Sequence, residues 1–244
     1  MREFGKYVLF LGSLLVRREK FKTYYQLILE ESIQIGVKST FLFILVSTFM
    51  GAVTTVQTSF NLVSPFVPRF VISQVVRDMA IYELAPTIMA IIFAGKVGSS
   101  MAGGIGTMKI TEQIDALEVM GINSSSYLVL PKIIASVLMF PLLVVVAGVC
   151  AIFGGYLVGT LTGIVTPTEY IQGIRYAFDP YTIKFALTKS VVFAFIISSI
   201  SCYKGYHTRG GALEVGIAST DAVTTSVITL LLSNYFLAEL LLSK

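Results

Sequence analysis

Long apolar segments dominate this 244-residue chain and limit the folds open to it. Five segments are apolar enough to cross a bilayer, at residues 35–58, 78–95, 128–164, 181–203 and 220–242. A helix needs about 20 apolar residues to span the hydrocarbon core, and the third segment is long enough to tilt or to extend beyond it. Only 13% of the residues are charged, against about 25% in soluble domains. We therefore predict an all-α integral membrane protein, because a transmembrane β-barrel would show short alternating segments instead.

The first 31 residues predict an amphipathic helix at the membrane surface. Phe4, Val8 and Leu11 recur at helical spacing within residues 2–31, with basic residues beside them. Such a helix buries its apolar side in the interface and is attracted to anionic lipid. A solvated helix packed on the rest of the protein is the alternative.

The distribution of Lys and Arg predicts the orientation of the chain. If the N-terminus is cytoplasmic, twelve of the 18 Lys and Arg residues lie on inside segments and six on outside segments. Positive charge favours the cytoplasmic side, so we expect the N-terminus in the cytoplasm and the C-terminus outside. The connection between the second and third spans is then cytoplasmic.

That connection contains a short acidic helix pattern at residues 109–120. Ile110, Ile114 and Leu117 share one side of the helix, and an acidic set shares the opposite side: Glu112, Asp115 and Glu118. Twelve residues rise only about 18 Å as a helix, too short for the roughly 30 Å hydrocarbon core. We expect this helix to be offered to another protein, which indicates a subunit of a larger assembly.

The glycine-rich run before this helix does not form a phosphate-binding loop. Gly95 and Lys96 are followed by Val97, so the GxxxxGK[ST] pattern is absent. The chain therefore does not itself hydrolyse ATP. We interpret the run as a tight helix exit at the membrane surface, where glycine supplies unusual backbone angles.

A family resemblance rests on several long strings. GTMKITEQIDALEVMG (residues 106–121) resembles the coupling-helix signature of the MlaE (YrbE) permeases, the membrane subunits of ABC-type phospholipid transporters. Three further strings match the family: YELAPTIMAIIFAGKVGSS (82–100), YLVLPKIIASVLMFPLL (127–143) and TKSVVFAFIIS (188–198). A glycine-rich pattern from Gly210 to Ser226 extends the likeness over nearly the whole chain.

The resemblance implies one permease domain over residues 1–244 in the bacterial inner membrane, serving outer-membrane lipid asymmetry. It implies a homodimer bound to cytoplasmic ATPase subunits and to an extracytoplasmic MCE-domain lipid-binding protein, with room for a small cytoplasmic regulator. ATP and Mg would reside on the ATPase, and this chain would carry no catalytic residue, metal or nucleic acid. The expected ATPase-coupling residues are Lys109, Glu112, Ile114, Asp115, Leu117, Glu118 and Met120. Their acids would meet basic residues of the ATPase, and the apolar members would fill a groove.

Two charges inside predicted spans form the other candidate site. Glu83 lies in the second span and Lys189 in the fourth. A charge near the bilayer centre costs about 2.5–3.5 kcal/mol on insertion scales and tends to face a cavity or a partner. The pair is either a polar rim of a lipid cavity, where Lys189 attracts a phosphate that Glu83 orients, or an ion pair joining two helices. Tyr82 stands where many relatives carry Arg, and Gly104 where they carry an acid, so those roles do not transfer.

By resemblance, the outer half of the first span lines the lipid pocket through Thr54, Gln57 and Leu62, beside Tyr82 and Glu83. Hydrogen bonds between helices are the alternative for the polar residues, because lipid offers none.

Two functions remain open at this point. The first is a permease subunit that moves phospholipid between the inner membrane and an MCE lipid carrier, powered by a partner ATPase. The second is an ion or small-solute secondary carrier or channel that uses Glu83 and Lys189. A lipid enzyme is disfavoured, since His207 is the only imidazole and no span carries paired acids.

Overall fold

The computed structural model describes residues 2–14, 21–62 and 67–242, and within these ranges every regular element is a helix. The α-helices are α1 (Arg2–Ser13), α2 (Phe21–Ser32), α3 (Lys38–Asn61), α4 (Phe70–Met79), α5 (Met89–Phe93), α6 (Ser99–Ile110), α7 (Gln113–Val119), α8 (Ser124–Leu161), α9 (Pro167–Arg175), α10 (Tyr181–Tyr206) and α11 (Ala212–Leu242). Three π-helical stretches lie between some of them: η1 (Ile33–Val37), η2 (Ala80–Ile88) and η3 (Ala94–Gly98).

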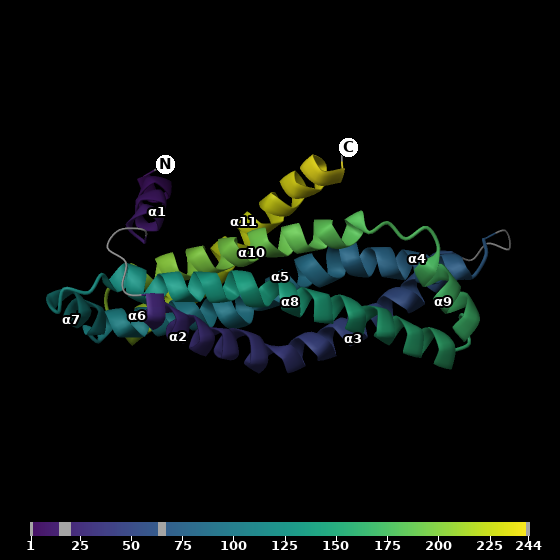
Figure 1. Cartoon of the computed structure of the whole chain (residues 1–244), viewed down its shortest axis with the longest axis horizontal. Coiled ribbons are helices and arrows are strands. Elements are labelled where there is room, and N and C mark those ends of the chain that lie inside the picture. Colours follow the sequence, from purple (N-terminus) through teal and green to yellow (C-terminus); the bar gives the residue numbers. More distant parts are fainter. Residues whose placement is uncertain (1, 15–20, 63–66, 243–244) are drawn as a thin grey trace. The chain divides into compact units, whose positions relative to one another are not determined.

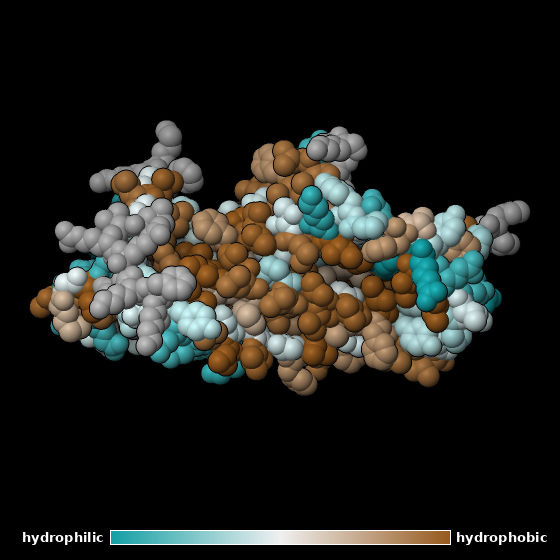
Figure 2. All heavy atoms as spheres, viewed as in Figure 1, coloured by the Kyte–Doolittle hydropathy of each residue, from teal (hydrophilic) through white to brown (hydrophobic). Residues whose placement is uncertain are grey.

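The predicted five-span, all-α architecture is confirmed. Five helical runs in the described chain are long and apolar enough to cross a membrane: Thr23–Asn61, Phe70–Ile110, Ser124–Leu161, Tyr181–Tyr206 and Ala212–Leu241. Large apolar side chains such as Phe41, Phe49 and Phe236 are exposed on them. On the face drawn in Figure 2, apolar side chains cover much of the long helices, and hydrophilic ones gather near α9 and near α6 and α7. This distribution suits a multi-pass membrane protein.

The helix expected over residues 2–31 consists of two helices, with residues 15–20 outside the described ranges. α1 is separate, whereas α2 continues through η1 into α3. The second half of the expected surface helix is therefore the start of the first helical run. Burial of Tyr24, whose hydroxyl lies 2.7 Å from the Ser126 hydroxyl, explains why this part packs within the protein.

The glycine-rich run is not a helix exit, which corrects the sequence interpretation. η3 and α6 continue the second run to Ile110, and no glycine before Gly121 has a positive φ in the described chain. These glycines permit close packing instead. A Cβ on Gly98 would lie 2.8 Å from the Ser201 hydroxyl, and one on Gly106 would lie 3.3 Å from Val215. The run has 41 residues, about twice the ~20 that a membrane-spanning helix needs.

Two compact units make up the fold, the first assembled from three stretches of the chain and the second from two. Unit 1 comprises Met1–Lys38, Ala90–Phe140 and Val191–Lys244, and unit 2 comprises Ser39–Met89 and Pro141–Ser190. In unit 1, α6 packs along α11 and ends beside α7 (Figure 1). In unit 2, the short helix α9 packs along α4 (Figure 1).

A stripe of glycines on α8, formed by Gly155 and Gly159 four residues apart, packs inside unit 2. A Cβ on Gly155 would lie 2.6 Å from the Thr55 hydroxyl and 2.5 Å from the Tyr170 hydroxyl, and one on Gly159 would lie 3.3 Å from Thr55. Gly163 differs from these two glycines. It follows the end of α8 and has a positive φ of 70°, which glycine adopts readily. The stripe therefore brings α3 and α9 close to α8 within one chain.

Candidate functional site

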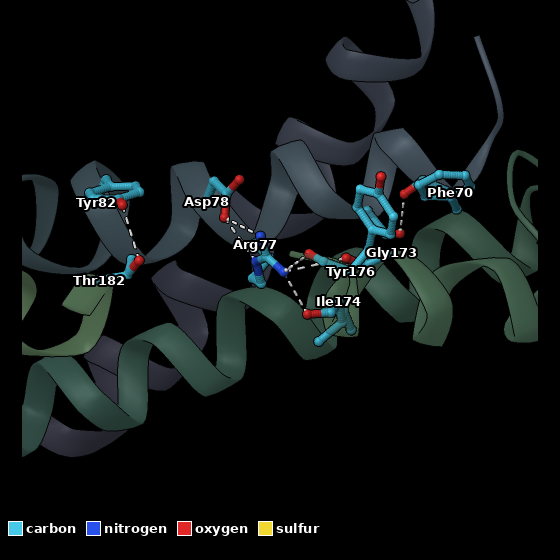
Figure 3. Close-up of polar contacts among 9 residues, drawn as sticks. Phe70, Arg77, Asp78, Tyr82, Gly173, Ile174, Tyr176 and Thr182 are labelled. Carbon is cyan, nitrogen blue, oxygen red and sulfur yellow. Dashed lines mark hydrogen bonds and ion pairs between the residues drawn. The ribbon is translucent and has the colours of Figure 1, made fainter. Parts of the chain in front are cut away.

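One face of α10 contacts η2 in unit 2. Thr182, Phe185 and Lys189 lie three and four residues apart, a spacing that puts them on the same side of a helix. The Tyr82 hydroxyl lies 3.0 Å from the Thr182 hydroxyl (Figure 3). The Tyr82 ring meets the Phe185 ring edge-on, with the two ring centroids 5.4 Å apart. The Tyr82 hydroxyl is thus engaged within the protein.

Lys189 and Glu83 form an ion pair in which the lysine is wholly buried. The Lys189 Nζ donates to Glu83 Oε1 at 2.9 Å and to the Tyr82 carbonyl at 3.0 Å, and it lies 5.0 Å from the centre of the Phe185 ring. The Lys189 side chain is 0% exposed, whereas that of Glu83 is 49% exposed. Glu83 also accepts a hydrogen bond of 2.8 Å from the Thr87 hydroxyl. The Glu83 carboxylate is therefore the part of the ion pair that a ligand could reach, whereas the Lys189 ammonium is buried.

Pro86 explains why the lysine reaches the backbone here. Pro86 lies inside η2 and has no N–H, so the carbonyl four residues earlier, that of Tyr82, loses its α-helical donor. Lys189 donates to that carbonyl. π-Helical turns are rare and frequently occur at functional sites. The ELAP string thus combines an accessible acid with a backbone acceptor that a buried lysine satisfies.

The structure brings Tyr82, Glu83 and Lys189 together. The other predicted lipid-site residues, Thr54, Gln57 and Leu62, have different neighbours. The Thr54 hydroxyl donates to the Met50 carbonyl one turn earlier at 2.8 Å. Gln57 is exposed on α3, and Leu62 packs against a buried apolar cluster formed by Ile72, Val76, Val165 and Tyr170. The ion pair is therefore the best-defined polar feature of the site.

A buried arginine that the sequence interpretation missed fastens α4 to α9. Arg77 is 3% exposed, pairs with Asp78 at 2.7 Å, and donates from Nη1 to the carbonyls of Ile174 at 2.7 Å and Tyr176 at 2.8 Å (Figure 3). The Phe178 ring lies 5.4 Å from its guanidinium carbon. The signal available in the sequence was an Arg-Asp pair at the start of an apolar run.

The helix held by this arginine is also defined at its other end. The Thr166 hydroxyl accepts from the Glu169 N–H, and Glu169 Oε2 accepts from the Thr166 N–H at 2.9 Å, which is a capping box. These hydrogen bonds to Thr166 lower the pKa of Glu169. Nearby, burial raises the pKa of Tyr170 to about 12, and its hydroxyl donates to the Ile152 carbonyl. α9 is thus fixed at both ends.

The acidic segment of unit 1 forms a shorter helix than predicted. α7 covers Gln113–Val119 only, because Glu112 adopts a left-handed φ of 59° and interrupts the helix after α6. Gly121, with a φ of 79°, ends α7: its N–H bonds the Glu118 carbonyl, and the next N–H bonds the Leu117 carbonyl. This is a Schellman motif, which needs the left-handed backbone that glycine adopts readily.

Most side chains of this segment have defined positions. The Lys109 Nζ pairs with Asp115 Oδ1 at 2.6 Å, and Glu118 Oε1 accepts from the Ser124 hydroxyl at 2.7 Å and the Tyr206 hydroxyl at 3.1 Å. Ile114 is 0% exposed. It anchors α7 within unit 1, so it does not fill a partner's groove as expected from the sequence.

The apolar surface of this segment lies at its C-terminal end. Val119 is 89% exposed and Met120 is 67% exposed, while Leu117 is half-buried. Val119 was not among the predicted coupling residues. Its exposure follows from the shortened helix, whose position is fixed by Ile114 and by the Schellman motif.

Comparison with known proteins places this arrangement in a family. The family model for Permease MlaE matches residues 28–240. The chain belongs to the MlaE permease family. It is 38% identical over 236 residues to a probable ABC transporter permease protein of Rickettsia bellii, which covers 97% of this chain and 91% of the relative.

Relatives outside that genus are similar as well. A probable ABC transporter permease protein of Synechocystis is 34% identical over 87% of this chain and 81% of its own length. The chloroplastic Protein TRIGALACTOSYLDIACYLGLYCEROL 1 of Arabidopsis thaliana is 32% identical over 93% of this chain and 65% of its own length. The chain is thus a multi-pass transporter permease subunit, and permeases of the ABC class work with an ATPase partner.

Proposed function

We propose that this permease moves phospholipid between the bacterial inner membrane and an extracytoplasmic MCE lipid-carrier protein, driven by ATP hydrolysis on a partner subunit. The observation that carries the proposal is α7. It follows a helical run that ends at Ile110, and it exposes Val119 and Met120 beside Asp115. An exposed apolar edge with acids next to it suits docking on a basic cleft of an ATPase.

Connectivity supports a mechanical role for this helix. The helical run Phe70–Ile110 contains Glu83 and ends three residues before α7 begins. A shift imposed on α7 by the ATPase would thus act on the helix that carries the polar site. Transport requires that the lipid bind differently in two states, and a change in the surroundings of Glu83 would supply that difference.

The lipid headgroup would meet Glu83 before Lys189. The half-exposed carboxylate is available to the hydrogen-bond donors or the ammonium of a headgroup, and Lys189 holds it in place from behind. A phosphate would reach the buried Lys189 only after Glu83 moved. The name of the Arabidopsis relative contains that of a diacylglycerol glycolipid, which agrees with a lipid substrate.

The proposed assembly is a homodimer in the inner membrane with a cytoplasmic N-terminus and an extracytoplasmic C-terminus. The bias of Lys and Arg in the sequence supports this orientation. It places α7 with the ATPase and α9 on the side of the MCE protein. Family membership favours this assembly over an ion or small-solute secondary carrier.

Two substitutions on α7 test the docking, one that reverses a charge and one that introduces a charge at an apolar position. We expect Asp115→Lys or Leu117→Asp to abolish co-purification of the ATPase in mild detergent, with the permease still folded. Glu239→Lys is the matched control, because Glu239 is exposed near the end of α11. Native mass spectrometry of the wild-type complex should show the ATPase, a second copy of the chain and bound phospholipid. Retention of the ATPase by both α7 variants would refute the proposal.

A further inference from the structure

A cavity of about 500 Å³ lies within unit 2. Its walls come from the end of α4, η2, α8, the end of α9 with the loop after it, and the first turns of α10. Residues that line it include Ile81, Ala85, Val145, Gly148, Ile183 and Leu187. This volume lies within the roughly 300–1,000 Å³ typical of ligand sites.

The interior of this cavity is apolar despite the arginine in its wall. The Arg77 guanidinium is committed to Asp78 and to the carbonyls of Ile174 and Tyr176. Water entering such a space would find too few polar partners. Left empty, the lining would lose dispersion contacts. The chemistry of the walls therefore selects a hydrocarbon chain.

A second arginine gives the cavity a cationic edge. Arg175, the last residue of α9, also borders the cavity but is exposed. Guanidinium groups bind phosphate well because their donors match its oxygens in pairs. A hydrocarbon interior with an exposed arginine at its edge is complementary to a lipid that carries a phosphate.

The cavity is separate from the Glu83–Lys189 pair. Neither of these residues lines it. Arg77, Ile81 and Ala85 recur every four residues on the cavity side of α4 and η2, whereas Glu83 lies midway between two of them and faces another side. Changes to the cavity can therefore be made without touching the ion pair.

We infer that this cavity binds one acyl chain of a bilayer phospholipid, with the phosphate of that lipid at Arg175. This goes beyond the proposed transport function, since it assigns a second lipid site within each chain. The site needs neither ATP nor a partner subunit. Binding can therefore be measured on the permease alone, and its outcome does not depend on whether transport occurs.

Photolabelling tests the acyl-chain site. The purified full-length chain is placed in phosphatidylcholine nanodiscs that contain a small fraction of phosphatidylglycerol with a diazirine in its acyl chain. Irradiation followed by peptide mass spectrometry should locate label on the peptides that contain Gly148 and Leu187. Gly148→Phe should lower this labelling at least five-fold. The matched control Gly148→Ala should keep it, because its Cβ would lie an ordinary 3.8 Å from the Ala85 Cβ.

A second variant covers the case in which Gly148→Phe does not fold. Val149 lines the cavity and is 63% exposed, so Val149→Trp narrows the opening at a position that tolerates bulk. It should also lower the labelling at least five-fold. Unchanged labelling in a folded Val149→Trp protein would overturn the acyl-chain site.

The phosphate contact is tested with two probes that share the same diazirine chain. Arg175→Ala should lower labelling by the phosphatidylglycerol probe at least three-fold and leave labelling by a diacylglycerol probe unchanged. Lys184→Ala is the control, since Lys184 is an exposed cation in the first turn of α10. Equal labelling of the wild type and Arg175→Ala by phosphatidylglycerol would overturn the assignment of the phosphate.

Discussion

Two acid–lysine pairs differ sharply in burial, and the difference separates what holds the fold from what is open to a partner. In unit 2, Lys189 pairs with Glu83 at 2.9 Å and is 0% exposed. In unit 1, Lys109 pairs with Asp115 at 2.6 Å, and the two side chains are 30% and 52% exposed. A buried charge that loses its partner is costly, whereas exposed pairs contribute little. The first pair is therefore part of the fold, and the second can exchange its partner.

The largest effect is expected when the buried lysine loses its acid. Glu83→Ala should destabilise the protein by about 3–5 kcal/mol, towards the lower end because Glu83 is itself half-exposed. Lys189 would remain buried beside the Tyr82 carbonyl, without the carboxylate that balances its charge. A thermal unfolding curve in detergent measures this as a clear drop in Tm. An unchanged Tm would show that the pair is not part of the fold.

Removing the lysine should cost less than removing the acid. Lys189→Met keeps the apolar volume and leaves a half-exposed carboxylate that still accepts from Thr87, so we expect a loss of about 1.5–3 kcal/mol, the value of a hydrogen bond to a charged group. The double variant with Glu83→Ala should be less destabilised than the sum of the single variants. Strict additivity of the unfolding free energies would contradict coupling between the two residues.

Breaking the exposed pair should have little effect on stability. Asp115→Asn should change the unfolding free energy by about 1 kcal/mol or less. Lys109→Gln, as the partner change, should do the same. A destabilisation as large as that of Glu83→Ala would remove the distinction between the two regions.

The smallest expected effect is a pH dependence at a third acid. The pKa of Glu169 is lowered by its hydrogen bonds to Thr166. Its contribution to stability is therefore complete above its ordinary pKa of 4.5 and is lost as the pH falls through the lowered value. Wild-type Tm should fall slightly more between pH 6 and pH 3.5 than that of Glu169→Gln. Identical pH profiles for the two proteins would contradict this role.

The sequence predicted the five spans and the position of the acidic helix, because both depend on local patterns of apolar and charged residues. It also left an ion pair between Glu83 and Lys189 as one of two interpretations, and the structure shows that pair. The match of the ELAP and TKSVV strings to a known family brought these two residues to attention.

Other features depend on tertiary contacts that a linear pattern does not contain. The glycine-rich run suggested a helix exit, but Gly98 and Gly106 pack against α10 and α11 in a continuous helix. Ile114 lies on the side expected to meet a partner, yet it is buried within unit 1. The role of Arg77 was missed because its acceptors are carbonyls almost 100 residues away, at the end of α9.

Lipid movement by the reconstituted complex tests the central claim most directly. The permease is placed in liposomes with its ATPase and MCE partners, and transfer of a fluorescent phospholipid between the bilayer and the MCE protein is followed over time. We predict transfer that requires ATP and the ATPase and that is lost with Asp115→Lys but kept with Glu239→Lys. Transfer at the same rate without ATP, or none with all partners present, would contradict the account.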